Sequence, residues 1–269
     1  MSVRIVRVDQ TRDPAVLAGV AALEGLASYP LGDDRFQVDH GPDYLAFFQR
    51  MGDLLYLAAV DGEQVVAVGA GVLRTIPYAD GEAPRRAWYL CDLKVHPEHR
   101  GRRIPLQLLR AGFCPHVLRC HRGYAISMDP PAGENRVVRL LGRWRWTPIR
   151  FARRLHLFSL DSEQMRAAAP AVEAERGPLG YLSLRGVKDI VLESTGQPMP
   201  LLHVVWGAAR EAAAAAAPQP EHTHMLCAPE DDPLDRALRA AGHQPSAKAS
   251  VVAHRMADCD WRFVLTSEI

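Results

Sequence analysis

Residues 89–109 constrain the fold of this chain more than any other stretch of the sequence. They read YLCDLKVHPEHRGRRIPLQLL, which is an apolar strand pattern, a tight basic turn and an apolar helix pattern. The first N–H groups of a helix have no intrahelical partner, and the helix dipole at that end favours anions. The amides of the turn add to this anion site, and Arg100, Arg102 and Arg103 supply guanidinium groups suited to phosphate. Gly101 allows a backbone geometry that a β-carbon would obstruct. The stretch predicts a polyphosphate site between a strand and a helix.

The patterns around this stretch predict a mixed α/β sheet. Asp13 before Pro14 is typical of an N-cap and the first residue of a helix, and Asp61-Gly62 between two apolar runs is typical of a β-hairpin. Gly69-Ala-Gly71 lies inside one of these runs and indicates a bulge or kink. Further strands are expected over residues 3–8, 54–60, 65–73, 87–95, 124–128 and 149–160, and helices over 44–51, 105–118 and 134–143. An antiparallel front half followed by a strand–helix–strand crossover favours helices packed on a sheet.

The composition changes after Leu160. Residues 162–177 are rich in Ala, Glu and Arg and predict a helical connector, and the alanine run predicts a helix to Ala217, broken by Pro218. Residues 139–148 (RLLGRWRWTP) and 236–245 (RALRAAGHQP) resemble each other, and each precedes an alternating strand pattern. We therefore interpret residues 1–162 as one domain and residues 163–269 as a second α/β unit, a degenerate copy of the closing helix–strand unit. The alternative is that any α/β chain produces two such units.

The basic turn resembles the coenzyme A motif of the GNAT acyltransferase superfamily. In that motif a strand ending in Val-His-Pro is followed, two residues later, by Arg-Gly and an amphipathic helix, as at residues 95–109 here. The resemblance covers roughly residues 1–160, and it extends to Glu134-Asn135 with the Leu and Trp residues after them, which are similar to the family helix beside pantetheine. Arg103 and Pro105 stand where the family usually has glycines, and Leu141 stands where a tyrosine often protonates the departing thiolate.

The resemblance implies a GNAT-like α/β (α+β) fold, with a mixed, mostly antiparallel sheet and flanking helices, and a second smaller α/β unit. It also implies acetyl-CoA, or another acyl-CoA, as co-substrate. The residues that the resemblance places at the coenzyme are Leu93, Lys94, Val95, Arg100, Gly101, Arg102, Arg103, Ile104, Pro105 and Asn135.

Acyl transfer to an amine needs orientation, a base and oxyanion stabilisation. Asp92 is the carboxylate nearest to the expected thioester and is the first candidate for the base, directly or through water. The alternative for Asp92 is a solvated or salt-bridged strand residue, with Lys94 on the same face as the partner of the salt bridge. A backbone N–H near Leu93 or Lys94 would be the oxyanion donor.

The sequence thus predicts an enzyme that transfers an acyl group from coenzyme A to an amine of a small molecule or peptide. One alternative is a non-catalytic acyl-CoA-binding or regulatory module, which the residues at 103, 105 and 141 favour. The other is a GNAT-like scaffold that binds nucleic acid through the arginines crowded into residues 136–154. A solvated cationic face explains those arginines more simply. Residues 29–42 and 76–85 are the segments expected on the acceptor side, and they contain no pattern that identifies the acceptor. The sequence is compatible with a homo-oligomer.

Composition and cysteine usage limit the remaining classes. Lys and Arg number 32 against 31 acidic residues, which does not favour a nucleic-acid binder. Five cysteines without CxxC spacing, and no apolar segment long enough for a signal or a span, predict a cytoplasmic protein with no membrane association. His222, His224 and Cys227 have no second ligand cluster beside them, so no metal site is expected.

Overall fold

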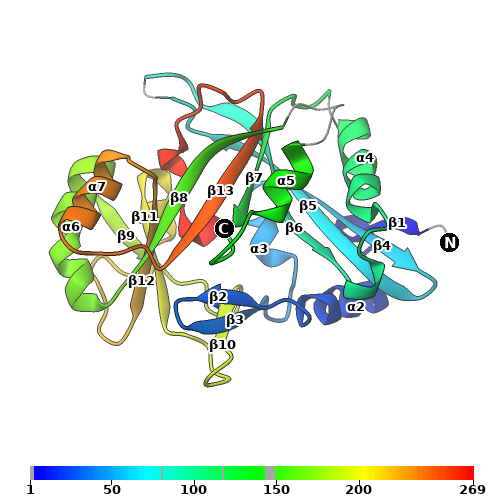
Figure 1. Ribbon diagram of the computed structural model, residues 1–269, viewed down its shortest axis with the longest axis horizontal. Helices are drawn as coiled ribbons and strands as arrows, with labels where there is room; N and C mark the ends of the chain where they lie inside the picture. Colours follow the sequence, from blue (N-terminus) through cyan, green and yellow to red (C-terminus); the bar gives the residue numbers. More distant parts are fainter. Residues whose placement is uncertain (1–2, 80, 117, 143–148) are drawn as a thin grey trace.

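The computed structural model describes residues 3–79, 81–116, 118–142 and 149–269, without the side chains of residues 113–115 and 140–142. A sheet of ten strands runs across the molecule, and helices cover its faces (Figure 1). A smaller sheet of three strands lies below it in this view (Figure 1).

The part of the chain up to Leu160 supplies most of the sheet and its first helices. Its strands are β1 (Arg4–Arg7), β2 (Tyr29–Leu31), β3 (Asp34–Asp39), β4 (Asp53–Asp61), β5 (Gln64–Ile76), β6 (Arg85–Val95), β7 (Gly123–Met128) and β8 (Arg150–Leu160). Its helices are α1 (Val8–Thr11), α2 (Pro14–Glu24), α3 (Ala46–Gln49), the 3-10 helix η1 (Pro97–His99), α4 (Ile104–His116) and α5 (Arg136–Gly142).

The remaining part repeats the alternation on a smaller scale. Its strands are β9 (Leu179–Leu182), β10 (Asp189–Leu192), β11 (Leu201–Trp206), β12 (Thr223–Pro229) and β13 (Ala247–His254). Its helices are α6 (Ser162–Arg176), α7 (Pro233–Ala240) and the 3-10 helices η2 (Gly207–Ala212), η3 (Trp261–Phe263) and η4 (Thr266–Glu268).

Eight strands of the large sheet, from β5 to β9, are arranged symmetrically about the pair β13–β8, and β1 and β4 extend the side of the first half. The order is β1-β4-β5-β6-β7-β13-β8-β12-β11-β9. On one side of the axis, β13 pairs with antiparallel β7, and β7 pairs in parallel with β6. On the other side, β8 pairs with antiparallel β12, and β12 pairs in parallel with β11. Each half therefore ends in a helix and a strand (α5–β8 and α7–β13), and each of these strands pairs with the other half. Figure 1 shows β8 and β13 side by side at the centre.

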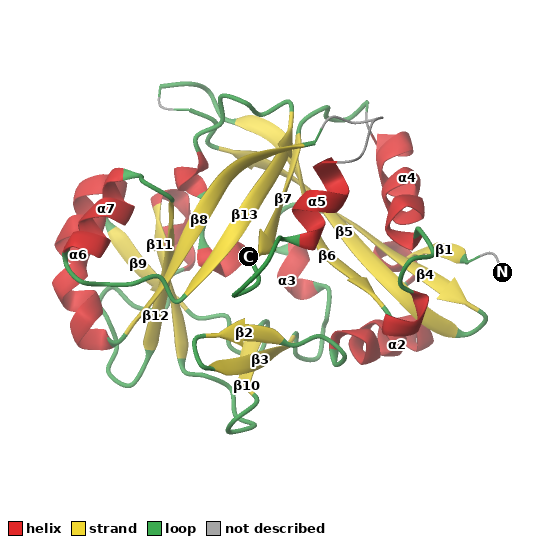
Figure 2. Cartoon of the chain, in the orientation of Figure 1, coloured by secondary structure: helices red, strands yellow, loops and turns green. Residues whose placement is uncertain are grey.

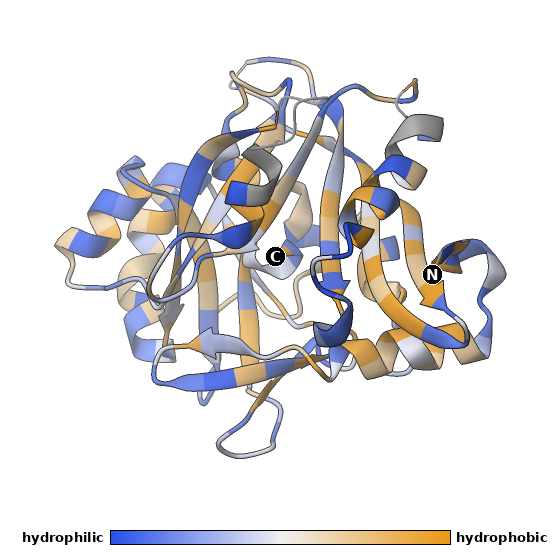
Figure 3. Ribbon diagram, turned by 45° about the vertical axis from the view of Figure 1, so that its right-hand side comes forward, coloured by the Kyte–Doolittle hydropathy of each residue, from blue (hydrophilic) through white to orange (hydrophobic). Residues whose placement is uncertain are grey.

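Three apolar clusters hold the layers together. Helix α4 covers one face of β4–β6 through Ile104 and Leu108, while α2 and α3 pack on the opposite face. Helices α6 and α7 cover the second half (Figure 2), with Met165 and Leu238 almost completely buried. Strands β4 and β5 are coloured mostly hydrophobic in Figure 3, as expected for strands covered on both faces.

Most of the predicted elements are confirmed. Asp13 caps α2 by accepting from the Ala15 N–H, and Gly62 takes a φ of 62° in the β4–β5 turn. Among the described residues, no helix is long and apolar enough to cross a membrane.

The helix predicted through the alanine run is wrong. The chain forms η2 and then an extended segment, in which Ala214 and Ala215 donate to the carbonyl oxygen of Tyr181 and Ala215 accepts from its N–H. These bonds cover the outer edge of β9, which would otherwise be unpaired. Tertiary pairing thus overrides the helix propensity of alanine.

Candidate active site

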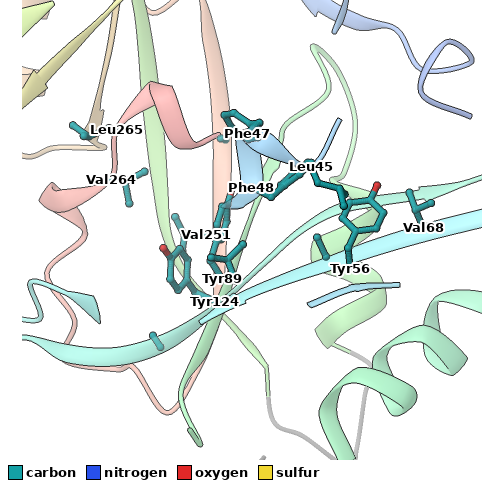
Figure 4. Packing of buried hydrophobic residues seen from close by; sticks show 14 of the residues in the cluster. Leu45, Phe47, Phe48, Tyr56, Val68, Tyr89, Tyr124, Val251, Val264 and Leu265 are labelled. Atoms are coloured by element: carbon teal, nitrogen blue, oxygen red, sulfur yellow. The ribbon is translucent and has the colours of Figure 1, made fainter. Parts of the chain in front are cut away.

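The candidate site begins where the parallel strands β6 and β7 diverge. They pair only through Trp88–Gly123, Tyr89–Tyr124 and Leu90–Ala125. Beyond these pairs, β6 continues along β5 and β7 continues along β13. The facing edges of β6 and β7 are therefore left without a ladder partner in the described part of the chain. The buried side of this opening is aromatic, with Tyr89 stacked on Tyr124 and with Phe47 and Phe48 nearby (Figure 4).

A β-bulge shapes the β6 side of the opening. Val68 pairs with Lys94 and Ala70 with Cys91, so β6 has one more residue than β5 between these pairs. The extra residue belongs to β6, opposite Gly69, whereas the sequence placed the irregularity at Gly69–Gly71. Asp92 takes a left-handed φ of 53° there, a conformation that costs roughly 1 kcal/mol for a residue other than glycine. The bulge leaves Leu93 43% exposed in the opening.

Behind the bulge lies a buried cluster of charged and hydroxyl groups, which we call the Asp92 cluster: Glu24, His40, Tyr44, Tyr56, Asp92 and Lys94. The Lys94 ammonium donates to Asp92 and lies 2.6 Å from Glu24 Oε2. The Tyr44 hydroxyl lies 2.6 Å from Glu24 Oε2 and 3.1 Å from Asp92 Oδ2, and the Tyr56 hydroxyl donates to Asp92. Glu24 comes from the end of α2, so the cluster ties that helix to β6.

The cluster fixes the protonation states of Asp92, Lys94 and His40. Burial raises the pKa of Asp92, but the Lys94 charge and the hydrogen bonds from Lys94 and Tyr56 outweigh it, so this pKa is below its usual value. Burial opposes the charge of Lys94, yet Asp92 and Glu24 raise the pKa of this lysine overall. Burial lowers the pKa of His40 to about 4, which leaves its ring neutral at pH 7. Asp92 and Lys94 are therefore a charged pair at neutral pH.

The donor atoms of Glu24, His40 and Asp92 lie within 4.8 Å of one another, a spacing that a metal ion could use. The Lys94 ammonium already contacts both carboxylates. Because this cation already lies between the two carboxylates, we assign no metal to the group.

The predicted phosphate turn leads directly into α4. Gly101 and Arg103 take positive φ values of 82° and 57°, and α4 begins at Ile104, one residue before the predicted Pro105. Nothing lies within 4 Å of a β-carbon placed on Gly101, so its backbone conformation, not crowding, is the reason for glycine there. Arg103 adopts a left-handed conformation where the resemblance expected a glycine. Arg102 lies 3.8 Å from Asp61.

A cavity of about 2030 Å³ connects the opening to the second half of the molecule. Of the predicted coenzyme residues, it is lined by Leu93, Lys94, Arg103, Pro105 and Asn135, and Asp92 lines it too. The other predicted residues, Val95, Arg100, Gly101, Arg102 and Ile104, do not line it, and Ile104 is buried under α4.

Asn135 has a structural task in this fold. Its Oδ1 accepts from the N–H groups of Val137 and Val138, which makes it the N-cap of α5. Its Nδ2 donates to the carbonyl oxygens of Ser127 and Met128 at the end of β7. Asn135 therefore fixes α5 at the rim of the cavity. Leu141, Trp144 and Trp146 lie outside the described side chains.

The far wall of the cavity comes from the small sheet and the second half. Strand β10 pairs with β3, so Ile190 lies beside Val38, and both residues line the cavity with Tyr29 and Phe36. Lys188, just before β10, and His203 of β11 line it as well. The sequence reasoning missed the distant members of this site. Of these members, Glu24 could have been recognised in the sequence, because a carboxylate on the apolar face of a predicted helix is unusual.

The equivalent opening of the second half is filled. Strands β11 and β12 pair from Leu201–Thr223 to His203–Met225. At that point Thr266 contacts both strands, because its hydroxyl lies 3.0 Å from His203 Nδ1 and donates to the Met225 carbonyl oxygen over 3.0 Å. The Cys227 thiol donates to the Val264 carbonyl oxygen, and the 3-10 helix η2 stands where the first half has α4. Within the described residues, the combination of an opening and a basic turn is found in the first half alone.

No protein-family model and no curated protein matches the sequence. Among solved structures, the chain is similar to a tandem GNAT protein from the clavulanic acid biosynthesis pathway, with 14% identity over 96% of this chain and 100% of that one, at a TM-score of 0.52. A GCN5-related N-acetyltransferase from Kribbella flavida has 16% identity over 95% and 72% of the two chains, at a TM-score of 0.45, too low to bear on the fold. The exchanged strands β8 and β13 and the two parallel pairs agree with a tandem arrangement, and the chain therefore has the fold of a tandem GNAT protein.

Proposed function

We propose that the chain transfers an acyl group, most simply acetyl, from coenzyme A to an amine. The observation that carries this proposal is the opening between β6 and β7, which adjoins a basic turn and a helix N-terminus. The cavity volume of about 2030 Å³ exceeds the roughly 300–1000 Å³ typical of a single small ligand, so it suits two substrates. The tandem GNAT protein named above, solved without AcCoA, supports the same class of reaction by its fold.

The donor would lie along the open edge of β6. The pantetheine amides would pair with the backbone between Leu93 and Val95, as an added strand pairs with a sheet edge. The diphosphate would meet the turn 100–105, where Arg103 faces the cavity and Arg136 and Arg139 of α5 face it from the other side. Asn135 would contribute by holding α5 in place.

The chemistry would take place at the bulge. A backbone N–H of Leu93 or Lys94 would stabilise the tetrahedral oxyanion. Asp92 would receive the proton of the acceptor ammonium directly or through water, because its lowered pKa keeps it ionised at neutral pH. The leaving group is the thiolate of coenzyme A, which is a much weaker base than an alkoxide, so its departure needs no strong acid.

The acceptor would enter from the side covered by β2, β3 and β10. We propose that residues 1–162 bind the donor and that residues 163–269 close the acceptor side, since β10 completes the small sheet there. Strand β13 belongs to the second of these units by sequence but lies between β7 and β8.

A non-catalytic acyl-CoA-binding module is the second candidate. The neutralised pair of Asp92 and Lys94 favours it, because a carboxylate held by an ammonium is a weak base. Thiol release with an amine present distinguishes the two functions, since the module would bind coenzyme A without turnover.

The decisive experiment is calorimetric titration of the full-length chain with acetyl-CoA and with coenzyme A, followed by an amine screen that measures thiol release. We expect micromolar binding, weakened at least tenfold in Arg103→Glu and in Arg100→Glu. Arg4→Glu, an exposed change on the far edge strand β1, is the matched control and should bind like the wild type. Failure of the wild type to bind either ligand would refute the proposed donor site.

A further inference from the structure

The second half of the chain places a lysine inside the cavity of the first half. Strand β10 pairs with β3, with Asp189 opposite Asp39, so the residues just beyond this pair, Lys188 and His40, lie at the same end of the small sheet. Both line the cavity. His40 belongs to the Asp92 cluster, and its ring lies 5.6 Å from the ring of Phe47.

Among the described residues, Lys188 forms no ion pair with an Asp or Glu side chain. Its ammonium donates to the backbone oxygen of Ile269 and lies 4.4 Å from the centroid of the Phe47 ring. Burial lowers the pKa of Lys188 to about 8, and the positive charges of Lys94 and Arg50 act in the same direction, while Asp92 and Cys91 oppose them. A substantial fraction of this amine is therefore neutral and nucleophilic in mildly alkaline solution.

Lys188 is electrostatically coupled to the bulge. Its charge interacts with Asp92 and Cys91 of β6, and the bulge is where the chemistry would take place in the proposed function. The groups that face it from the surrounding elements are Lys94, Asp92 and Cys91 of β6, Arg50 after α3, His40 after β3 and His203 of β11. Its contact with Phe47 of α3 puts the amine on the face of the sheet opposite α4.

We propose that Lys188 is a self-acylation site, which takes the acyl group from acyl-CoA bound in the cavity. The inference rests on the proposed donor site. The neutral amine attacks the thioester carbonyl carbon, the N–C bond forms, the C–S bond breaks, and coenzyme A leaves as the thiol with the proton from nitrogen. The product is an amide that removes one positive charge and fills the acceptor side of the cavity.

The composition makes this site simple to test. The sequence has three lysines, Lys94, Lys188 and Lys248. Lys94 is held as an ion pair by Asp92 and Glu24, and Lys248 is exposed on β13. Lys94 is therefore the internal control for a buried lysine, and Lys248 is the internal control for uncatalysed acylation.

The full-length chain is incubated with acetyl-CoA and no acceptor, digested with a protease that does not cut at lysine, and mapped by mass spectrometry. We expect one acetyl group on Lys188, formed faster than on Lys248. The rate at pH 9 should be about ten times that at pH 7, following the neutral fraction of an amine with a pKa near 8. Excess coenzyme A should suppress acylation of Lys188 but not of Lys248.

Two variants separate the outcomes. Lys188→Arg keeps the positive charge and should lose the adduct, whereas Lys248→Arg should keep it. Coenzyme A binding is measured on the same preparations by calorimetry. Binding without faster acylation of Lys188 than of Lys248 would overturn the self-acylation site and leave the donor site standing. Absence of binding would remove the proposed function, and this inference with it.

Discussion

Removing the Lys94 ammonium should destabilise the fold by an amount that grows as the pH rises. In Lys94→Met, two buried carboxylates, Glu24 and Asp92, lose the cation that lies between them. Breaking a buried ion pair by removing one partner costs about 3–5 kcal/mol. For a chain of this size that loss lowers the Tm by about 6–20 °C at neutral pH.

The sign of the pH effect follows from linkage. In the wild type the pKa of Asp92 is lowered by folding, so its stabilising contribution is present above the unfolded pKa and is lost as the pH falls through the folded pKa. In the variant, burial without the cation raises the folded pKa of Asp92 above its unfolded value. At Asp92 the folded variant then binds more protons than the unfolded chain, and the contribution of this residue to stability falls as the pH rises through this range.

The assay is the free energy of unfolding in urea between pH 4 and pH 8, for wild type, Lys94→Met and the control Lys248→Met. His40, whose pKa is lowered to about 4 by burial, makes all of these proteins gain stability between pH 4 and pH 6, so the quantity compared is the difference from the wild type at each pH. This difference should grow with pH for Lys94→Met and stay constant for Lys248→Met. Asp92→Asn added to Lys94→Met should reduce this growth, because a neutral amide replaces one of the two buried carboxylates. A Lys94→Met variant within 1 kcal/mol of the wild type, with an unchanged pH profile, would refute the electrostatic account of this cluster.

Three further predictions address other parts of the molecule. Calorimetry should give one coenzyme A per chain, because Thr266 fills the second opening; a stoichiometry of two would contradict that reading. Gly101→Ala should cost about 1 kcal/mol through its φ of 82°, measured by thermal unfolding against Gly25→Ala, whose φ is negative. Residues 1–162 expressed alone should fail to give a cooperative unfolding transition, because β7 and β8 would each lose β13; a sharp transition would show that the first half is complete without it.

Local signals predicted most of the elements. The Asp13-Pro14 cap, the Asp61-Gly62 hairpin and the basic turn into α4 depend on neighbours within a few residues, and all three are present. The alanine run misled the prediction because its structure depends on the edge of β9, more than thirty residues earlier.

The site was harder to predict than the fold. The pairing of Asp92 with Lys94 was foreseen as an alternative because both residues lie on one strand. Glu24, Tyr44 and Tyr56 join them from separate elements, and no periodicity in the sequence relates such positions. The catalytic role of Asp92 stays a prediction.

The exchange of β8 and β13 has a consequence for how the protein is made. The edge of β7, which ends at Met128, is covered only by β13, which ends at His254. At a synthesis rate of about 5–20 residues per second, the 126 residues between these positions (254 − 128) take roughly 6–25 s to emerge. During that time the nascent first half exposes an unpaired strand edge beside an aromatic core. The timing of translation, and any chaperone that shields such an edge, therefore bears on the yield of folded protein.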